Sequence, residues 1–222
     1  MPAPEFIAAG DKSSRHLLIA LHGLGDSAAG YRFLPSMLGL PWMNYLLVNA
    51  PDSYFGGFSW YEFNGEPGPG IVRSRALVMD ILEQQRAAGF PSSQTSLLGF
   101  SQGCLMTVDV GFRYAHRLAA LVGISGYVHE PALLLKELSP AAKQQRMLFT
   151  HGTQDPLIPC AEVRQQVDVL RKAGLDITWR EFVKAHTIEG KAEIDLIRQF
   201  LRTCHEDGKP AAAEMKRINR AD

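Results

Sequence analysis

Ser101 lies at the centre of the segment Gly99-Phe100-Ser101-Gln102-Gly103, which is a GxSxG motif. An apolar run at 95–98 precedes the motif and a helix-like run beginning at Cys104 follows it, so the context predicts a strand, a sharp turn and a helix. Such a turn holds its serine in a strained backbone conformation that exposes the hydroxyl beyond the sheet. The flanking glycines avoid the clash that a Cβ would cause. Ser101 is therefore a candidate nucleophile.

His186 is the candidate general base for this serine. An alcohol is a poor nucleophile at neutral pH and needs a base to take its proton. His186 follows the strand-like run 177–183 and precedes an amphipathic helix marked by Ile194, Ile197 and Leu201. A surface histidine in a connecting loop is the alternative interpretation, which the serine motif upstream disfavours.

Asp155 is the candidate acid, directly after the strand-like run 147–150. A carboxylate there can accept the Nδ1 proton of His186 and stabilise the imidazolium that forms during the reaction. A turn or helix-capping aspartate ahead of Pro156 is the alternative, and Glu130 is a weaker candidate for the acid. The chain order of serine, acid and histidine is the one found in the α/β-hydrolase fold, and it favours the catalytic interpretation.

Two backbone N–H groups are expected to bind the oxyanion that forms when the serine attacks a carbonyl. One is that of Gln102, at the N-terminus of a helix whose partial positive charge favours an anion. The other is assigned to Leu24, in the glycine-containing loop 22–27 after the strand-like run 16–21.

The loop at 22–27 also permits a competing interpretation. Gly23, Gly25 and Ala28 match the GxGxxA pattern of dinucleotide-binding folds. That pattern requires an acidic residue about 20 positions further on, at the end of the second strand, to bind a ribose hydroxyl. Asn49 stands there instead, and the pattern leaves the serine, acid and histidine unexplained.

Residues 52–70 form a glycine- and proline-rich segment with six aromatic residues. These side chains must bury area, and at the ligand-binding edge of a sheet they would form an apolar acyl pocket. We expect Phe58, Trp60 and Tyr61 to line it, with Leu157 and Ile158 opposite. An ordinary packed loop is the alternative.

Strand-like apolar runs alternate with helical periods along most of the chain. This order predicts an α/β fold with a mostly parallel central sheet and helices on both faces, with ligands beyond the carboxyl ends of the strands. The runs are 6–8, 16–21, 45–49, 95–99, 118–124, 147–150 and 177–183, and helices are expected at 71–86, around 163–171 and from 194. One domain is expected over 1–204, followed by a polar tail at 205–222 that includes His205.

Composition excludes several other classes of protein. The 222 residues carry 23 basic and 23 acidic side chains without a basic stripe, so nucleic acid is not an expected partner. The apolar runs are too short to span a membrane, and the N-terminus does not have the pattern of a signal peptide, which predicts a cytoplasmic protein. Cys104, Cys160 and Cys204 are too scattered for a disulfide framework or a metal site.

Several motifs together resemble the phospholipase/carboxylesterase family, which includes bacterial carboxylesterases and acyl-protein thioesterases. They are His22-Gly-Leu-Gly-Asp26, Gly99-Phe-Ser-Gln-Gly103, Gly123-Ile-Ser-Gly-Tyr127 and His151-Gly-Thr-Gln-Asp-Pro156. The resemblance covers 16 to about 202, and Ser101, Asp155, His186, Leu24 and Gln102 match the family's catalytic and oxyanion positions.

The resemblance implies an α/β-hydrolase that cleaves carboxylic esters, and in some members lysophospholipids or S-acyl thioesters, without cofactor or metal. Ala185 and Cys104 depart from the family's pattern, since both stand where many members have glycine. A hydrolase-fold protein that binds a ligand without turning it over is the alternative function. A monomer and a homodimer are both left open.

Overall fold

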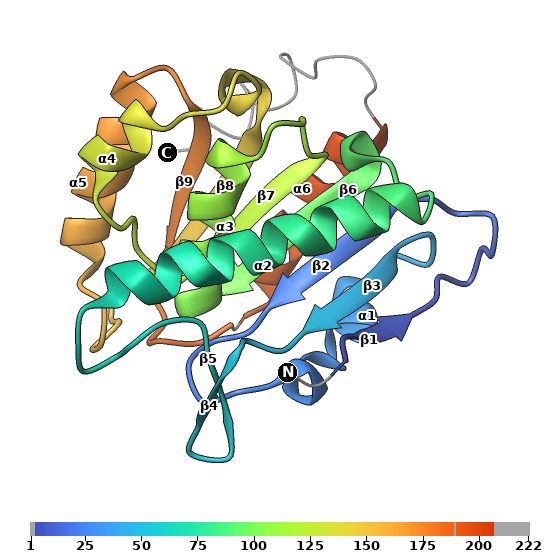
Figure 1. Cartoon of the computed structure of the whole chain (residues 1–222), viewed down its shortest axis with the longest axis horizontal. Coiled ribbons are helices and arrows are strands. Elements are labelled where there is room, and N and C mark those ends of the chain that lie inside the picture. The colour runs from blue at the N-terminus through green and yellow to red at the C-terminus, as the bar shows by residue number, and fades with distance from the viewer. Residues whose placement is uncertain (1–2, 189, 207–222) are drawn as a thin grey trace.

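A seven-stranded sheet forms the centre of the computed structural model, which describes residues 3–188 and 190–206 (Figure 1). The strand order is β1-β3-β2-β6-β7-β8-β9. Strand β1 is antiparallel to β3, and all other neighbours are parallel. The bounds are β1 Glu5–Ile7, β2 Leu17–Leu21, β3 Asn44–Val48, β6 Thr95–Phe100, β7 Ala120–Ile124, β8 Arg146–Gly152 and β9 Asp176–Phe182. The predicted mostly parallel sheet is confirmed.

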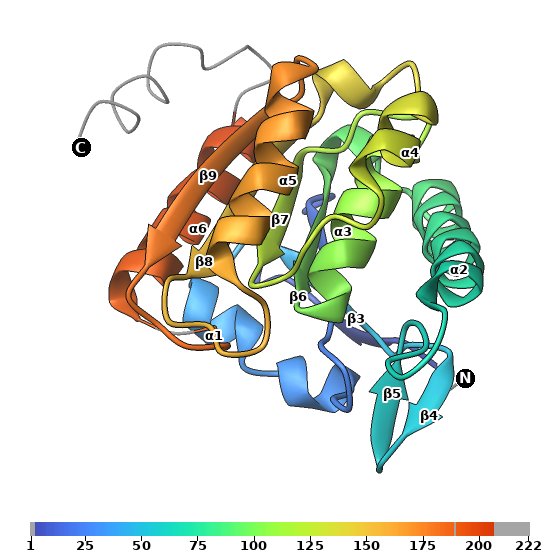
Figure 2. The same cartoon turned by 90° about the vertical axis from the view of Figure 1, so that its left-hand side faces the viewer.

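Helices cover both faces of the sheet, as predicted (Figure 2). One face carries α2 (Pro67–Ala87), α3 (Gln102–Arg113), α4 (Pro131–Lys136) and α5 (Cys160–Lys172), and the other carries α1 (Leu34–Leu38) and α6 (Lys191–Glu206). Single 3-10 turns lie at Ala28–Tyr31, Ser92–Gln94 and Ala142–Gln144.

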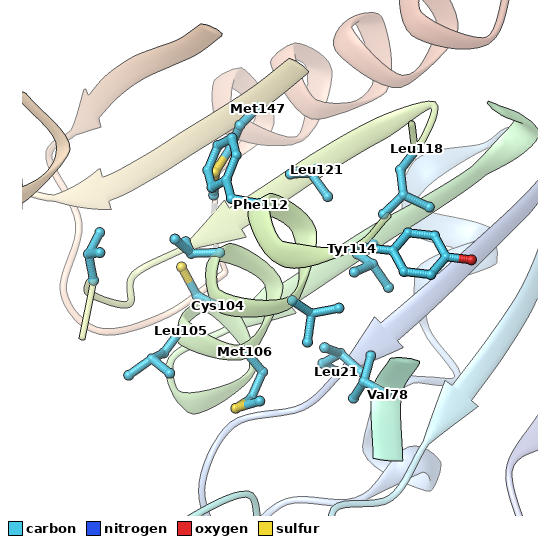
Figure 3. Packing of buried hydrophobic residues seen from close by; sticks show 14 of the residues in the cluster. Leu21, Val78, Cys104, Leu105, Met106, Phe112, Tyr114, Leu118, Leu121 and Met147 are labelled. Atoms are coloured by element: carbon cyan, nitrogen blue, oxygen red, sulfur yellow. The ribbon is translucent and has the colours of Figure 1, made fainter. Parts of the chain in front are cut away.

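The central strands are buried on both sides, which explains why their sequences are apolar without alternation. Every residue of β2, β3 and β7 is buried. Helix α3 is almost as enclosed, because all of its residues except Arg113 are buried. Figure 3 shows its side chains, including Cys104 and Phe112, packed among those of Leu121 and Met147 from the sheet. The sheet therefore fixes the helix that follows Ser101.

The segment 52–70 contains a hairpin that the sequence analysis did not predict. Strands β4 (Asp52–Tyr54) and β5 (Gly57–Ser59) pair antiparallel through a turn in which Phe55 and Gly56 both have positive φ, 43° and 88°. Two positive φ values match the twist of a tight hairpin. The short helices α1 and α4 were not predicted either.

The C-terminal end of the described chain differs from the expected tail. Helix α6 continues to Glu206, so His205 belongs to its last turn rather than to a polar tail. The remainder of the expected tail, 207–222, lies outside the described residues. Within the described ranges, no helix is both long enough and apolar enough to cross a membrane.

Candidate active site

Ser101 occupies a strained turn between β6 and α3. Its φ of 54° and ψ of −116° are unusual for a residue with a side chain. The turn requires both flanking glycines: a Cβ on Gly99 would lie 2.0 Å from the carbonyl oxygen of Gly103, and a Cβ on Gly103 would lie 2.0 Å from that of Leu21. These contacts are with backbone atoms, which cannot move aside cheaply. The predicted reason for the glycines is confirmed.

His186 lies next to the Ser101 hydroxyl. Its Nε2 atom is 2.9 Å from Ser101 Oγ, and its ring packs against Phe100 with ring centroids 4.9 Å apart. The histidine is carried by the loop between β9 and α6, at the carboxyl ends of the strands. The structure therefore brings the candidate nucleophile and the candidate base into hydrogen-bond contact.

Asp155 completes the chain of hydrogen bonds. Its Oδ2 atom lies 2.7 Å from His186 Nδ1, while Oδ1 accepts the N–H groups of Leu157 and Ile158, each at 2.9 Å. Burial of the carboxylate would raise its pKa, but the bonds from Ile158, His186 and Leu157 outweigh burial and lower the pKa of Asp155. The acid is therefore held ionised and oriented toward the imidazole.

Glu130, the weaker candidate for the acid, lies elsewhere. Its side chain is 59% exposed, and its carboxylate lies 3.7 Å from Nε2 of His129. The residue precedes α4 with a φ of 44°. No contact joins it to His186 among the described residues, so Asp155 is the carboxylate that the structure brings to this histidine.

His151 supports the turn that binds Asp155, a role that sequence reasoning did not identify. Its Nε2–H donates to the carbonyl of Ile158 at 2.9 Å, and its ring stacks on Trp179. Burial lowers the pKa of His151, so the ring is neutral at physiological pH. It thus fixes the segment whose N–H groups hold the Asp155 carboxylate.

The N–H groups of Leu24 and Gln102 make no hydrogen bond to any described residue, which leaves both available to a ligand. The loop that carries Leu24 lies against the nucleophile, since a Cβ on Gly23 would lie 3.4 Å from Ser101 Cβ. His22 holds this loop in place: Nδ1–H donates to the Gly23 carbonyl at 2.6 Å, and Nε2 accepts the Ala50 N–H at 3.0 Å. This support was not apparent in the sequence.

A cavity of about 490 Å³ opens beside Ser101. Its lining includes Leu24, Tyr61, Phe63, Phe100, Tyr127, Leu157, Ile158 and His186. The volume lies in the range of small-molecule sites. Tyr61, Leu157 and Ile158 thus lie where the sequence analysis expected them.

Phe58 and Trp60, which were also expected in the lining, do not contribute to it. Trp60 is fully buried in the core, and its indole N–H donates to the His22 carbonyl at 2.8 Å, while Phe58 packs against the core. The Gln102 side chain holds this segment: its Oε1 accepts the Trp60 N–H at 2.9 Å and its Nε2 donates to the Tyr61 carbonyl at 3.1 Å. Trp60 therefore supports the loop that carries Leu24 rather than contacting a ligand.

Cys104 fits behind the nucleophile because two glycines face it. A Cβ on Gly126 would lie 2.4 Å from Cys104 Cβ, and one on Gly123 would lie 2.7 Å from its sulfur. Burial raises the pKa of this thiol far above its usual range.

Within residues 3–188 and 190–206, no group of three or more His, Cys, Asp or Glu side chains is arranged to hold a metal ion.

Comparisons with known proteins agree with this geometry. Residues 2–205 match the family described as Phospholipase/Carboxylesterase. Acyl-protein thioesterase 1 of Schizosaccharomyces pombe is 31% identical over 159 residues, which cover 64% of this chain and 69% of the relative.

Solved structures share the fold. The crystal structure of esterase PE8 superposes with a TM-score of 0.81 at 23% identity, over 91% of this chain and 98% of the other. The Bacillus cereus carboxylesterase superposes with a TM-score of 0.78 at 18% identity, over 90% and 93%. The chain therefore belongs to the phospholipase/carboxylesterase family and is an α/β-hydrolase that acts on esters or thioesters.

Proposed function

We propose that Ser101, His186 and Asp155 form the catalytic triad of this hydrolase. The observation that supports this assignment is the continuous chain of hydrogen bonds from Ser101 Oγ through the imidazole to Asp155, at 2.9 and 2.7 Å. As Oγ bonds to the substrate's carbonyl carbon, Nε2 of His186 takes the hydroxyl proton, and the carbonyl π electrons move onto oxygen. Asp155 keeps the proton of His186 on Nδ1 and stabilises the imidazolium.

The N–H groups of Leu24 and Gln102 are the proposed donors to the oxyanion. They donate no hydrogen bond to a described residue, so they can bind the charge as it develops without breaking existing bonds. When the tetrahedral intermediate collapses, the alcohol or thiol leaves with the proton from His186, and the acyl group stays on Ser101. Water, deprotonated by His186, then attacks the acyl-enzyme and releases the carboxylic acid.

Small to medium acyl esters and S-acyl thioesters are the proposed substrates. The apolar part of the cavity lining, which includes Tyr61, Phe63 and Leu157, suits an acyl chain. The relative from Schizosaccharomyces pombe is named a thioesterase, which supports the inclusion of thioesters. A series of p-nitrophenyl esters and matched thioesters of increasing chain length, compared by kcat/KM, tests this proposal. A maximum at long chains would contradict it.

A fluorophosphonate probe distinguishes the enzyme from a ligand-binding protein of the same fold. An activated serine is labelled covalently, whereas an inert serine is not. We expect the wild-type chain to be labelled and Ser101→Ala to remain unlabelled. An unlabelled, folded wild-type chain would favour the inactive alternative.

A cytoplasmic location is also proposed. Cys104, Cys160 and Cys204 are all free thiols, and free cysteines suit a reducing compartment. Fractionation of the source cells, followed by fluorophosphonate labelling of each fraction, tests the location.

A further inference from the structure

Lys184 and Glu193 form an ion pair that is almost completely shielded from solvent, beside the loop that carries His186. Their side chains are 4% and 0% exposed. The ammonium nitrogen of Lys184 lies 2.7 and 2.9 Å from the two carboxylate oxygens of Glu193, and it donates to the carbonyl of Thr187 at 2.6 Å. An ammonium group has three N–H donors, and these contacts provide three acceptors.

The Lys184 side chain contacts a residue on the other side of His186 in the chain. Lys184 lies two residues before the histidine and Thr187 one residue after it, so the Lys184 side chain bridges the turn from one side to the other. Glu193 lies in the first turn of α6, so its ion pair with Lys184 connects the segment around His186 to this helix. The imidazole is thus attached to a backbone segment whose two sides are held together by one buried cation.

The backbone of Lys184 also connects this turn to the acid. Its carbonyl accepts the N–H of Gln154, the neighbour of Asp155, at 3.1 Å. A Cβ on Gly152 would lie 2.3 Å from the same carbonyl, which shows how closely the turn lies against the end of β8. The backbone at Lys184 therefore fixes the segment that contains His186 relative to the loop that contains Asp155.

Stability alone does not account for such a pair. Removing two charges from water is costly, and replacing a buried ion pair with apolar residues of similar volume is often neutral or stabilising. The hydrogen bond from Lys184 to the Thr187 carbonyl is directional, so it can fix the geometry of the segment 184–187 in a way that apolar side chains cannot. We propose that Lys184, held by Glu193, is a positioning residue that sets the His186 ring between Asp155 and Ser101. The inference rests on the proposed function of His186.

The double variant Lys184→Met/Glu193→Met tests this role. It removes both charges at once, so neither is left buried without a partner, and methionine approximates the volume of each side chain. We expect a chain that folds, with kcat for a p-nitrophenyl ester about 10- to 100-fold lower, because small displacements of a catalytic group are costly. KM should stay within about twofold, since the apolar residues that line the cavity are unchanged. The rate of fluorophosphonate labelling should fall by the same factor as kcat.

Arg75→Met is the matched control. Arg75 binds the buried carboxylate of Asp109 at 2.6 Å, between α2 and α3, and Arg113 keeps that carboxylate paired when Arg75 is removed. We expect a lower Tm with unchanged kcat. If Arg75→Met lowers kcat as much as the double variant, general destabilisation explains the loss and the positioning role is overturned.

The remaining outcomes are also decisive. Labelling and turnover of the folded double variant at the wild-type rates would overturn the positioning role while leaving the proposed function intact. An unlabelled wild-type chain would instead overturn the proposed function. If the double variant does not fold, Glu193→Gln provides the measurement, because it keeps the side chain's size but removes its charge. Wild-type kcat in that variant would also overturn the role.

Discussion

The Nε2 atom of His186 lies 2.9 Å from the Oγ atom of Ser101, although the two residues are 85 positions apart in the chain. Ser101 follows β6 directly, and His186 follows β9 in the loop that leads to α6. In a parallel sheet the carboxyl ends of the strands meet at one edge, so residues placed directly after strands converge there. Strands β7 and β8 lie between β6 and β9, so the loop after β9 must also reach back across two strands to bring His186 to Ser101.

Replacing Ser101 with alanine should reduce kcat by roughly a million-fold, if the triad behaves like those measured in other serine hydrolases. The proposed oxyanion donors and the cavity remain, so the folded state should be retained. Turnover of a p-nitrophenyl ester measures the loss, and Tm checks the folding. Turnover close to that of the wild-type chain would end the assignment of the nucleophile.

Asp155→Asn should reduce kcat by roughly ten-thousand-fold. The amide oxygen can still accept the N–H groups of Leu157 and Ile158, which leaves the amide NH₂ facing Nδ1 of His186. The imidazole would then carry its proton on Nε2, toward Ser101, and could not act as a base. Comparison of kcat with that of Glu130→Gln, which removes the exposed carboxylate, measures the specific effect. Equal losses in both variants would contradict the role of Asp155.

The sequence was sufficient to select the three residues of the proposed triad, which the structure brings together, because each of them follows an apolar strand-like run. The runs before Ser101 and Asp155 correspond to β6 and β8, and the order of strands and helices is enough to predict a parallel sheet. The cavity lining was harder to predict. Whether Trp60 faces a ligand or the core depends on its partners His22 and Gln102, which come from other elements.

Short elements were missed for a related reason. The helices α1 and α4 have five and six residues, which is less than two turns, so no helical period can be recognised. The β4–β5 hairpin turns at Phe55-Gly56, and phenylalanine rarely occupies a position with positive φ. Tertiary contacts decide such segments, and local sequence does not encode those contacts.

Gly103→Ala should lower both stability and activity. The added Cβ would lie 2.0 Å from the carbonyl oxygen of Leu21, which leads into the loop that carries Leu24. Relief of this clash must shift α3 or that loop, and overpacking of this kind costs roughly 1–3 kcal/mol. For a chain of this size, Tm should fall by roughly 3–10 °C. Both proposed oxyanion donors would move, so kcat should fall as well.

Gly68→Ala is the matched control for that substitution. Gly68 lies in the first turn of α2, and a Cβ there would have no atom within 4 Å. Thermal unfolding and p-nitrophenyl ester hydrolysis should both match the wild-type chain. A Gly103→Ala variant that also matched it would show that the close approach of α3 to β2 is not required.

His205 should make the protein less stable as the pH falls. Its Nδ1 lies 2.8 Å from Nδ1 of His16 and its Nε2 lies 2.7 Å from Oγ of Ser96. Burial, followed by the charges of His16 and Arg146, lowers the pKa of His205 to about 3. A histidine in the unfolded chain has a pKa of about 6.5. At pH values between the folded and the unfolded pKa, the unfolded chain therefore binds a proton at His205 that the folded chain does not. The free energy of unfolding should therefore decrease as pH falls through this window.

Thermal unfolding at about pH 7 and about pH 5 measures the effect, and His205→Gln should reduce the difference in Tm by a few degrees. His116→Gln, which removes a more exposed histidine, should leave that difference unchanged. An undiminished difference in His205→Gln would mean that the acid sensitivity arises from other groups, of which buried His22 and His151 are the first to test, because burial lowers the pKa of both.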